Sequence, residues 1–204
     1  MAKINLKTYK LGEGLHAYRK DGMCAMEFVA YLNGEPHSDR PQCASPVLTS
    51  FVIRLNDHWN DKERQLLKPF LKRIIGTRDE KDAERARVLT MGVANRVVPL
   101  LLKDQGLIKD AKAMRAAKTL NDADRAINNA IDNINNTHIY MYNVMHTAAH
   151  SVHKAIDTCY YKKIRLFNSV NYPASIITDA CEYNTIRKAV IKEALKLLDK
   201  VLKL

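Results

Sequence analysis

One stretch in the second half of the chain constrains the fold more than any other, because it holds neither proline nor glycine between Asn121 and Tyr172. Residues of one face recur through it mostly at steps of four and three, at Ile127, Ile131, Ile134, His138, Met141, Met145, Ala148, Val152 and Ile156. This period is typical of an α-helix that packs on partners along its length. The stretch is expected to form one very long helix, or two helices with a break in the asparagine-rich part near Thr137.

The rest of the chain carries the start and stop signals of shorter helices. Helices tend to begin at a side chain that accepts a backbone N–H, or at a proline, and often end at a glycine. The predicted starts are Asp21, Ser45-Pro46, the pairs Asn60/Glu63 and Thr77/Glu80, and Pro173, and the predicted ends are Gly34, Gly76 and Gly106. Pro69 and Pro99 should each kink a helix or mark where one begins. These signals predict an all-α protein.

We expect a compact N-terminal helical unit over residues 1–106, followed by long C-terminal helices in a bundle over residues 107–204. An apolar share of 47% is enough for a core without disulfides. The last helix, from Pro173 to Leu204, is the expected partner of the long apolar stripe. Where this pairing leaves the stripe uncovered, two chains should associate, so a homo-oligomer is predicted.

The chain is basic, with 33 Lys and Arg against 22 Asp and Glu and a formal net charge of +11. Such a surplus attracts polyanions, whether nucleic acid, nucleotides or an acidic protein, and it does not choose among them. A basic surface that only aids solubility is the competing interpretation.

The cysteines point to a reducing compartment. Cys24, Cys43, Cys159 and Cys181 lie far apart in the sequence, no signal peptide precedes them, and no apolar run approaches the length of a membrane span. A cytoplasmic protein without a membrane partner is expected.

The loop from Gly34 to Ala44 is the first candidate site, since it presents His37, Asp39 and Arg40 between two apolar helices. Cys24, His37 and Cys43 could bind zinc, with Asp39 or Glu27 orienting a histidine or activating a water, although the spacing fits no standard zinc motif. A Cys/His nucleophile pair is a further possibility. The alternative is that the cysteines are core residues and the polar side chains bond loop backbone groups.

The same region resembles a family of uncharacterised proteins encoded by bacteriophages and actinobacteria. The resemblance rests on DGMCAMEFVAYLNGEPHSDRPQCASPV, with LGEGLH before it and LLKPFLKRIIGTR after it, and is supported by the C-terminal ALKLLDKVLKL. It implies a phage or bacterial cytoplasmic setting, which is the host cytoplasm if the protein is phage-encoded, and it implies no mechanism.

A row of histidines is the second candidate site. His146, His150 and His153 stand at i, i+4 and i+7, so they share one helix face. Two histidines one turn apart can bind a metal, but Thr147 stands where the HExxH motif of metallohydrolases has its glutamate. The alternatives are packing at a helix interface and stacking on ligand bases beside Tyr140 and Tyr142.

The third candidate site is the most concentrated basic and aromatic segment of the chain, formed by Tyr160, Tyr161, Lys162, Lys163 and Arg165. Aromatic rings interleaved with lysine and arginine suit a stacked, phosphorylated ligand. A second basic strip, Lys109, Lys112, Arg115 and Lys118, could follow a phosphate backbone or be a solvated helix face.

No glycine-rich phosphate loop, GxSxG elbow or DxD pair is present, so the residues favour binding over catalysis and suggest no cofactor. The sequence therefore predicts a non-enzymatic, phage-type accessory protein that binds an anionic ligand and counteracts host defence. The alternatives are a metal-dependent enzyme, using either the loop or the histidine row, and an inhibitor that binds a host protein.

Overall fold

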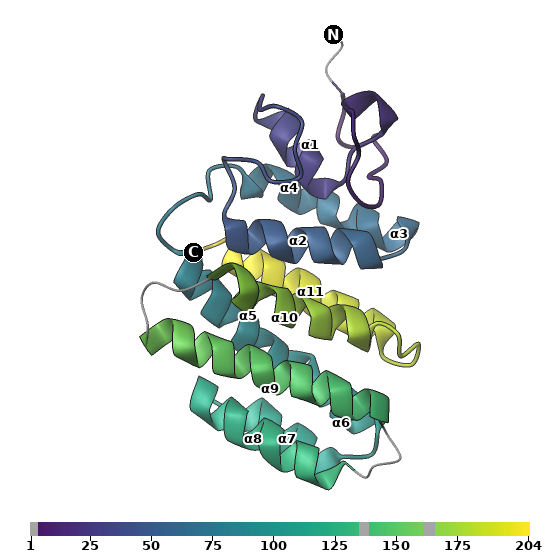
Figure 1. Cartoon of the computed structure of the whole chain (residues 1–204). Helices are drawn as coiled ribbons and strands as arrows, with labels where there is room; N and C mark the ends of the chain where they lie inside the picture. The colour runs from purple at the N-terminus through teal and green to yellow at the C-terminus, as the bar shows by residue number, and fades with distance from the viewer. Residues whose placement is uncertain (1–3, 135–138, 161–165) are drawn as a thin grey trace. The chain divides into compact units, whose positions relative to one another are not determined.

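The computed structural model describes residues 4–134, 139–160 and 166–204, with the side chains of 139–141, 154–160 and 166–172 outside the description. All regular elements of these residues are helices and none is a strand (Figure 1). The chain divides into two compact units, Met1–Glu80 and Lys81–Leu204. The predicted fold class, a compact helical N-terminal unit followed by longer helices in a bundle, is confirmed.

Along the chain, the boundary between the two units follows Glu80, whereas the sequence predicted a boundary after residue 106. Helix α5 (Asp82–Arg96) packs on the C-terminal helices α9, α10 and α11, and α6 (Val98–Asp104) packs on α5 and α7. The core of the second unit therefore includes both helices. Gly106, with a φ of 79°, ends α6 as expected, but this helix end lies inside the second unit and is no boundary.

The first unit contains α1 (Ala25–Leu32), α2 (Pro46–His58), α3 (Asp61–Arg64) and α4 (Lys68–Ile74), with 3₁₀ turns at Arg19–Asp21 and Gln65–Leu67. Helix α1 packs on α2 and α4. The largest apolar side chains of this core are fully buried and include Phe28, Leu48, Phe51, Leu55, Trp59 and Leu71. Burial of these aromatic and aliphatic side chains stabilises the unit.

Most predicted helix ends of the first unit are confirmed. The Ser45 hydroxyl accepts the N–H of Leu48 at 3.3 Å, and the Asn60/Glu63 pair forms a reciprocal capping box. Pro69 lies in the first turn of α4, where the missing N–H costs little. Gly34 and Gly76, which have positive φ, end α1 and α4.

Two predicted helix starts in the first unit are wrong. Helix α1 is capped by Cys24 rather than Asp21, in a capping box completed by Glu27. Thr77 caps no helix: its hydroxyl accepts the N–H of Ser45 at 3.0 Å and donates to the carbonyl of Ile74 at 2.7 Å. Thr77 therefore ties the end of α4 to the start of α2, a long-range role that its local sequence pattern does not reveal.

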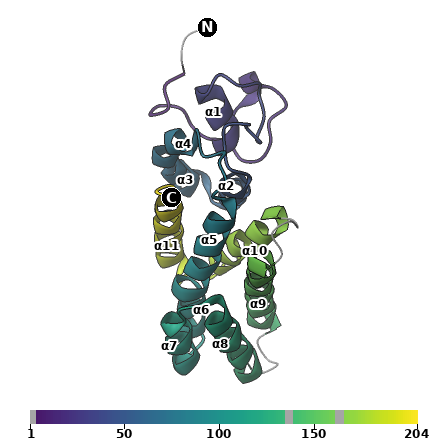
Figure 2. The ribbon, with the colours of Figure 1, turned by 90° about the vertical axis from the view of Figure 1, so that its left-hand side faces the viewer.

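The second unit is arranged around α5. It contains α5 and α6, followed by α7 (Ile108–Ala116), α8 (Leu120–Asn133), α9 (Ile139–Tyr160), α10 (Leu166–Ala180) and α11 (Arg187–Val201). Figure 2 shows α5 between α11 on one side and α9 with α10 on the other, and α5 contacts all three. In the described part of the chain, no helix has both the length and the apolar character of a membrane span.

The long stretch without proline or glycine contains α8 and α9, which pack against each other (Figure 1), and the start of α10. The predicted break near Thr137 lies outside the described residues. The described alanine, valine and methionine side chains of α9 are buried, namely Val144, Met145, Ala148, Ala149 and Val152. Their main partners are α8, α10 and α5, rather than a single final helix. These residues are covered within one chain, and the homo-oligomer stays a prediction.

Pro173 does not begin the last helix, as predicted, but lies inside α10. A proline within a helix costs about 3 kcal/mol through a lost hydrogen bond and a steric clash. The packing of α10 on α9 and α5, with Ala174, Ile176 and Ile177 buried, offsets that cost. The last helix, α11, is therefore shorter than expected.

Candidate functional site

A fully buried carboxylate lies in the first unit, where Glu27 has a side chain 0% exposed. It accepts hydrogen bonds from the backbone N–H of Cys24 at 2.7 Å and of His16 at 2.8 Å. Nδ1 of His16 donates to the same carboxylate at 2.8 Å. Burial alone would raise the pKa of Glu27, but these donors outweigh it and the pKa is lowered. The carboxylate is thus ionised at neutral pH.

Two histidines contact Glu27, and their hydrogen bonds fix their tautomers. Carboxylate and carbonyl oxygens only accept, so Nδ1 of His16 carries a proton. Nε2 of His37 also carries one, because it donates to the His16 carbonyl at 2.9 Å, and it lies 3.5 Å from Oε1 of Glu27. The His16 ring fits closely beside Gly12 and Gly22, where an added Cβ would come within 2.6 and 2.7 Å of ring atoms. The contacts among Glu27, His16 and His37 therefore hold the segment around His16 and the loop of His37 against α1.

The loop from residue 34 to residue 44 is also held by Glu35. Its carboxylate accepts the backbone N–H groups of Gln42 at 2.5 Å and Cys43 at 2.9 Å. Asp39 is half-buried and Arg40 exposed on this loop. The structure thus gives His37 a contact with Glu27 and places Asp39 and Arg40 on a backbone that is fixed in advance.

The two cysteines of this region have structural surroundings. Sγ of Cys24 accepts the N–H of Glu27 at 3.4 Å, and burial raises the pKa of this thiol to about 12. Burial, together with Glu35, raises the pKa of Cys43 to about 11. Such thiols stay protonated at neutral pH and are poor nucleophiles. Within the described residues, no three or more His, Cys, Asp or Glu side chains are placed to hold a metal ion, so Cys24, His37, Asp39 and Cys43 form no such group.

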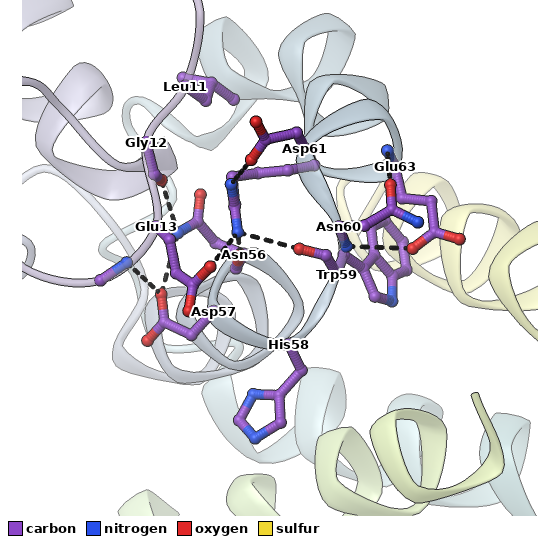
Figure 3. Close-up of polar contacts among 12 residues, drawn as sticks. Leu11, Gly12, Glu13, Asn56, Asp57, His58, Trp59, Asn60, Asp61 and Glu63 are labelled. Carbon is purple, nitrogen blue, oxygen red and sulfur yellow. Dashed lines mark hydrogen bonds and ion pairs between the residues drawn. The ribbon is translucent and has the colours of Figure 1, made fainter. Parts of the chain in front are cut away.

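A buried arginine fixes the segment before His16. Arg64 donates from Nη2 to the carboxylate of Glu13 and the carbonyl of Trp59, both at 2.9 Å, and from Nη1 to Asp61 at 2.9 Å (Figure 3). Its Nε donates to the carbonyl of Asn56 at 2.6 Å. A buried guanidinium is costly unless its donors are satisfied, and here each nitrogen has an acceptor.

Asn56 and Asp57 continue this network at the end of α2. The Asn56 amide donates to the carbonyl of Gly12 at 3.1 Å and to Asp57 at 2.9 Å (Figure 3). Its oxygen accepts the N–H of Ala25 at 3.1 Å. Asp57 also accepts the N–H of Gly14 at 3.1 Å. The polar groups of the first unit therefore hold its irregular segments in place, which is a structural role.

The predicted histidine row lies on the surface of α9. His146, His150 and His153 are exposed, and so is Tyr142, one turn before His146. The rings of Tyr142 and His146 are 4.2 Å apart between centroids. His153 pairs with Asp124 of α8 at 3.1 Å. In the described residues these histidines are not buried in the core and belong to no group of three or more side chains placed to hold a metal ion. Ligand contact stays a prediction.

The structure describes very little of the third candidate site. Tyr160 is the last residue of α9, its side chain is outside the described residues, and Tyr161, Lys162, Lys163 and Arg165 are outside them altogether. In sequence, this segment directly follows the helix that bears Tyr142 and the histidines.

The second basic strip is exposed along α7 and just after it, at Lys109, Lys112, Arg115 and Lys118. Helix α7 packs on α8, and α8 packs on α9. The second unit therefore carries exposed cations on α7 and exposed rings on α9.

In comparisons with known proteins, no family model, no curated protein and no solved structure matches the chain. The resemblance to phage and actinobacterial proteins therefore stays a prediction.

Sequence reasoning missed several residues that organise the first unit. His16 and Arg64 were not expected to act, because their partners Glu27 and Glu13 are distant in sequence. The local signal that could have directed attention to His16 is the pair of nearby glycines, Gly12 and Gly22, which leave room for its ring.

Proposed function

We propose that the protein is a non-enzymatic binder of an anionic ligand, a nucleotide-type signal or a nucleic acid. The observation that carries the proposal is the exposed ring face of α9, formed by Tyr142, His146, His150 and His153. Exposed aromatic and imidazole rings are surfaces on which bases stack, at about 1–3 kcal/mol per base. The second unit supplies both the rings and exposed cations.

Positive charge supports an anionic ligand over a neutral one. The whole chain carries a net charge of +11, and the strip Lys109, Lys112, Arg115 and Lys118 is exposed in the same unit as the rings. Lys162, Lys163 and Arg165 follow α9 in the sequence and are the proposed phosphate contacts. Lysine and arginine contacts to phosphate position a nucleic acid without reading its sequence.

Binding is proposed in preference to catalysis because the reactive groups of the first unit have other roles. The carboxylate of Glu27 is saturated by donors that hold loops, and the thiols of Cys24 and Cys43 have raised pKa values. The resemblance to phage proteins adds a biological setting to the proposal, in which the bound ligand serves a phage in its contest with the host.

Titration of the full chain with single-stranded DNA, RNA and cyclic nucleotides at low salt tests the proposal. We expect binding that weakens as salt rises, because counterions are released from the phosphates. Replacing Lys162, Lys163 and Arg165 by alanine should weaken binding and reduce the salt slope by about one for each phosphate that is no longer bound. Absence of binding to every one of these ligands would refute the proposal.

Substitution of the ring face locates the site. Tyr142→Ala should weaken binding about tenfold, since one stacked ring is removed. Tyr18→Ala is the matched control, because Tyr18 is an exposed tyrosine of the other unit, at 64% exposure against 41% for Tyr142. Equal effects of the two substitutions would show that α9 is not the binding surface.

A further inference from the structure

A hollow in the first unit has a lining unlike that of the α9 face. Its volume is about 1030 Å³, at the upper end of the range of small-molecule sites. It is lined by residues 4–7, by Leu32 at the end of α1, and by residues of α4 and its flanks, namely Gln65, Lys68, Pro69, Lys72 and Ile75. The site is independent of the ring face, which belongs to the second unit.

The walls of this hollow are fixed by hydrogen bonds. The N–H of Ile4 donates to the Tyr31 hydroxyl at 2.6 Å, which attaches the N-terminal segment to α1. Gln65, also in the lining, accepts the N–H of Leu11 at 3.0 Å and donates to the Leu11 carbonyl at 3.1 Å. Walls that are held in place before a ligand arrives reduce the entropy lost on binding.

The charge of the lining has one sign. Lys7 stands on the wall of residues 4–7, while Lys68 and Lys72 stand one turn apart on α4 and so share a helix face. None of the lining residues that the structure describes is acidic. Three ammonium groups without a carboxylate favour an anion with more than one negative charge.

The remaining walls are aliphatic. They include Leu6, Leu32 and Ile75, and the described lining holds no aromatic ring. A nucleobase would find no stacking surface here, whereas an alkyl chain gains about 0.8 kcal/mol for each buried methylene. The two properties of the lining, positive and aliphatic, call for a ligand with a charged head and a saturated tail.

We propose that this hollow binds a single-chain lipid with a phosphate monoester head group. The alkyl chain lies against Leu6, Leu32 and Ile75, and the phosphate is held by Lys7, Lys68 and Lys72. The lysine ammonium is a mobile point charge suited to a phosphate.

Calorimetric titration of the full chain with dodecyl phosphate, below the concentration at which it forms micelles, tests this proposal. We expect saturable binding with one molecule per chain and an increase in the melting temperature. Shortening the chain should weaken binding about tenfold for every two methylenes removed. Inorganic phosphate alone and dodecanol alone should each bind at least about tenfold more weakly than dodecyl phosphate.

Matched lysine substitutions separate the site from general electrostatics. Lys72→Gln should weaken binding of dodecyl phosphate by about five- to tenfold, because one charged group no longer holds the phosphate. Lys62→Gln removes the same charge from an exposed position on α3 of the same unit and should leave binding unchanged. Circular dichroism of both variants confirms that the fold is intact.

Three results would overturn the proposal. One is equal weakening by Lys62→Gln and Lys72→Gln, and another is binding that does not depend on chain length. A melting temperature that falls on addition of dodecyl phosphate would also overturn it, because it means that the amphiphile binds the unfolded chain. Tyr142→Ala should not change dodecyl phosphate binding, so failure here and failure of the proposed function on α9 are distinguishable.

Discussion

Glu27 and Arg64 are both buried in the first unit, and each is surrounded by groups of complementary character. Glu27 accepts two backbone N–H groups and a histidine N–H, while Arg64 donates to two carboxylates and two carbonyls. Among their partners, His16 and Glu13 lie on the irregular segment before α1, so Glu27 and Arg64 both hold that segment against the helices. Removing one partner would leave a buried charge or donor unsatisfied.

Glu27→Gln should lower the free energy of unfolding by about 2–4 kcal/mol at pH 7. The amide NH₂ group would face the N–H donors that now bind the carboxylate, and the negative charge that pairs with them would be lost. The pKa of Glu27 is lowered in the folded state, so its contribution is fully present above the usual carboxyl pKa and is lost as pH falls through the folded value. The difference between wild type and variant should therefore shrink in acid.

Urea unfolding at a series of pH values from about 7 to 3 measures this difference, because the series runs from above the usual carboxyl pKa to below it, where the lowered folded pKa of Glu27 lies. Glu80→Gln, at an exposed position of the same unit, is the control and should change stability by less than about 0.5 kcal/mol. A difference that grows in acid would contradict the assigned role of Glu27.

At the scale of helices, most ends are set locally, and the crossing of α5 and α11 is set by a small residue. Gly92 lies within α5 at the contact with α11, where an added Cβ would come 2.1 Å from a methyl carbon of Leu197. Leu197 is buried, so its side chain has little room to move. The close approach of α5 and α11 therefore depends on the missing side chain at position 92.

Gly92→Ala should lower the stability of the second unit by about 1 kcal/mol, because overpacking costs about 1–3 kcal/mol and the higher helix propensity of alanine returns up to about 1. In a Leu197→Ala background the space is open, and the same substitution should instead be stabilising. Denaturant unfolding monitored by circular dichroism measures the change in stability caused by Gly92→Ala in each background. An effect of the same sign in both backgrounds would mean that Leu197 is not the obstacle.

At the scale of the molecule, each of the two units has its own buried core. Trp59, the single tryptophan, is buried in the first unit, and the helices that pack on α5 form the second. Units with separate cores can unfold in separate steps, and tryptophan fluorescence then reports on the first unit alone.

Core substitutions in the two units should therefore act on different transitions. Leu55→Ala, in α2, should lower the denaturant midpoint seen by Trp59 fluorescence, at a cost of about 2–5 kcal/mol. Leu198→Ala, in α11, should lower the denaturant midpoint of the main transition seen by circular dichroism and leave the midpoint seen by Trp59 fluorescence unchanged. Both positions are 0% exposed, so the substitutions are matched in burial. If either substitution moves both transitions equally, the chain unfolds as one cooperative unit.

The sequence by itself determined the helical class and most helix ends, because caps, prolines, glycines and the apolar period act over three or four residues. Ser45, the Asn60/Glu63 pair, Pro69 and Gly76 are such cases. Only the tertiary structure decided which distant groups meet.

The partners of Glu27, the role of Thr77, the position of Pro173 inside α10 and the boundary at Glu80 all depend on packing between segments far apart in the chain. The exposure of His146, His150 and His153 was decided in the same way, since the helical period places them on one face but only the neighbouring helices determine whether that face is covered.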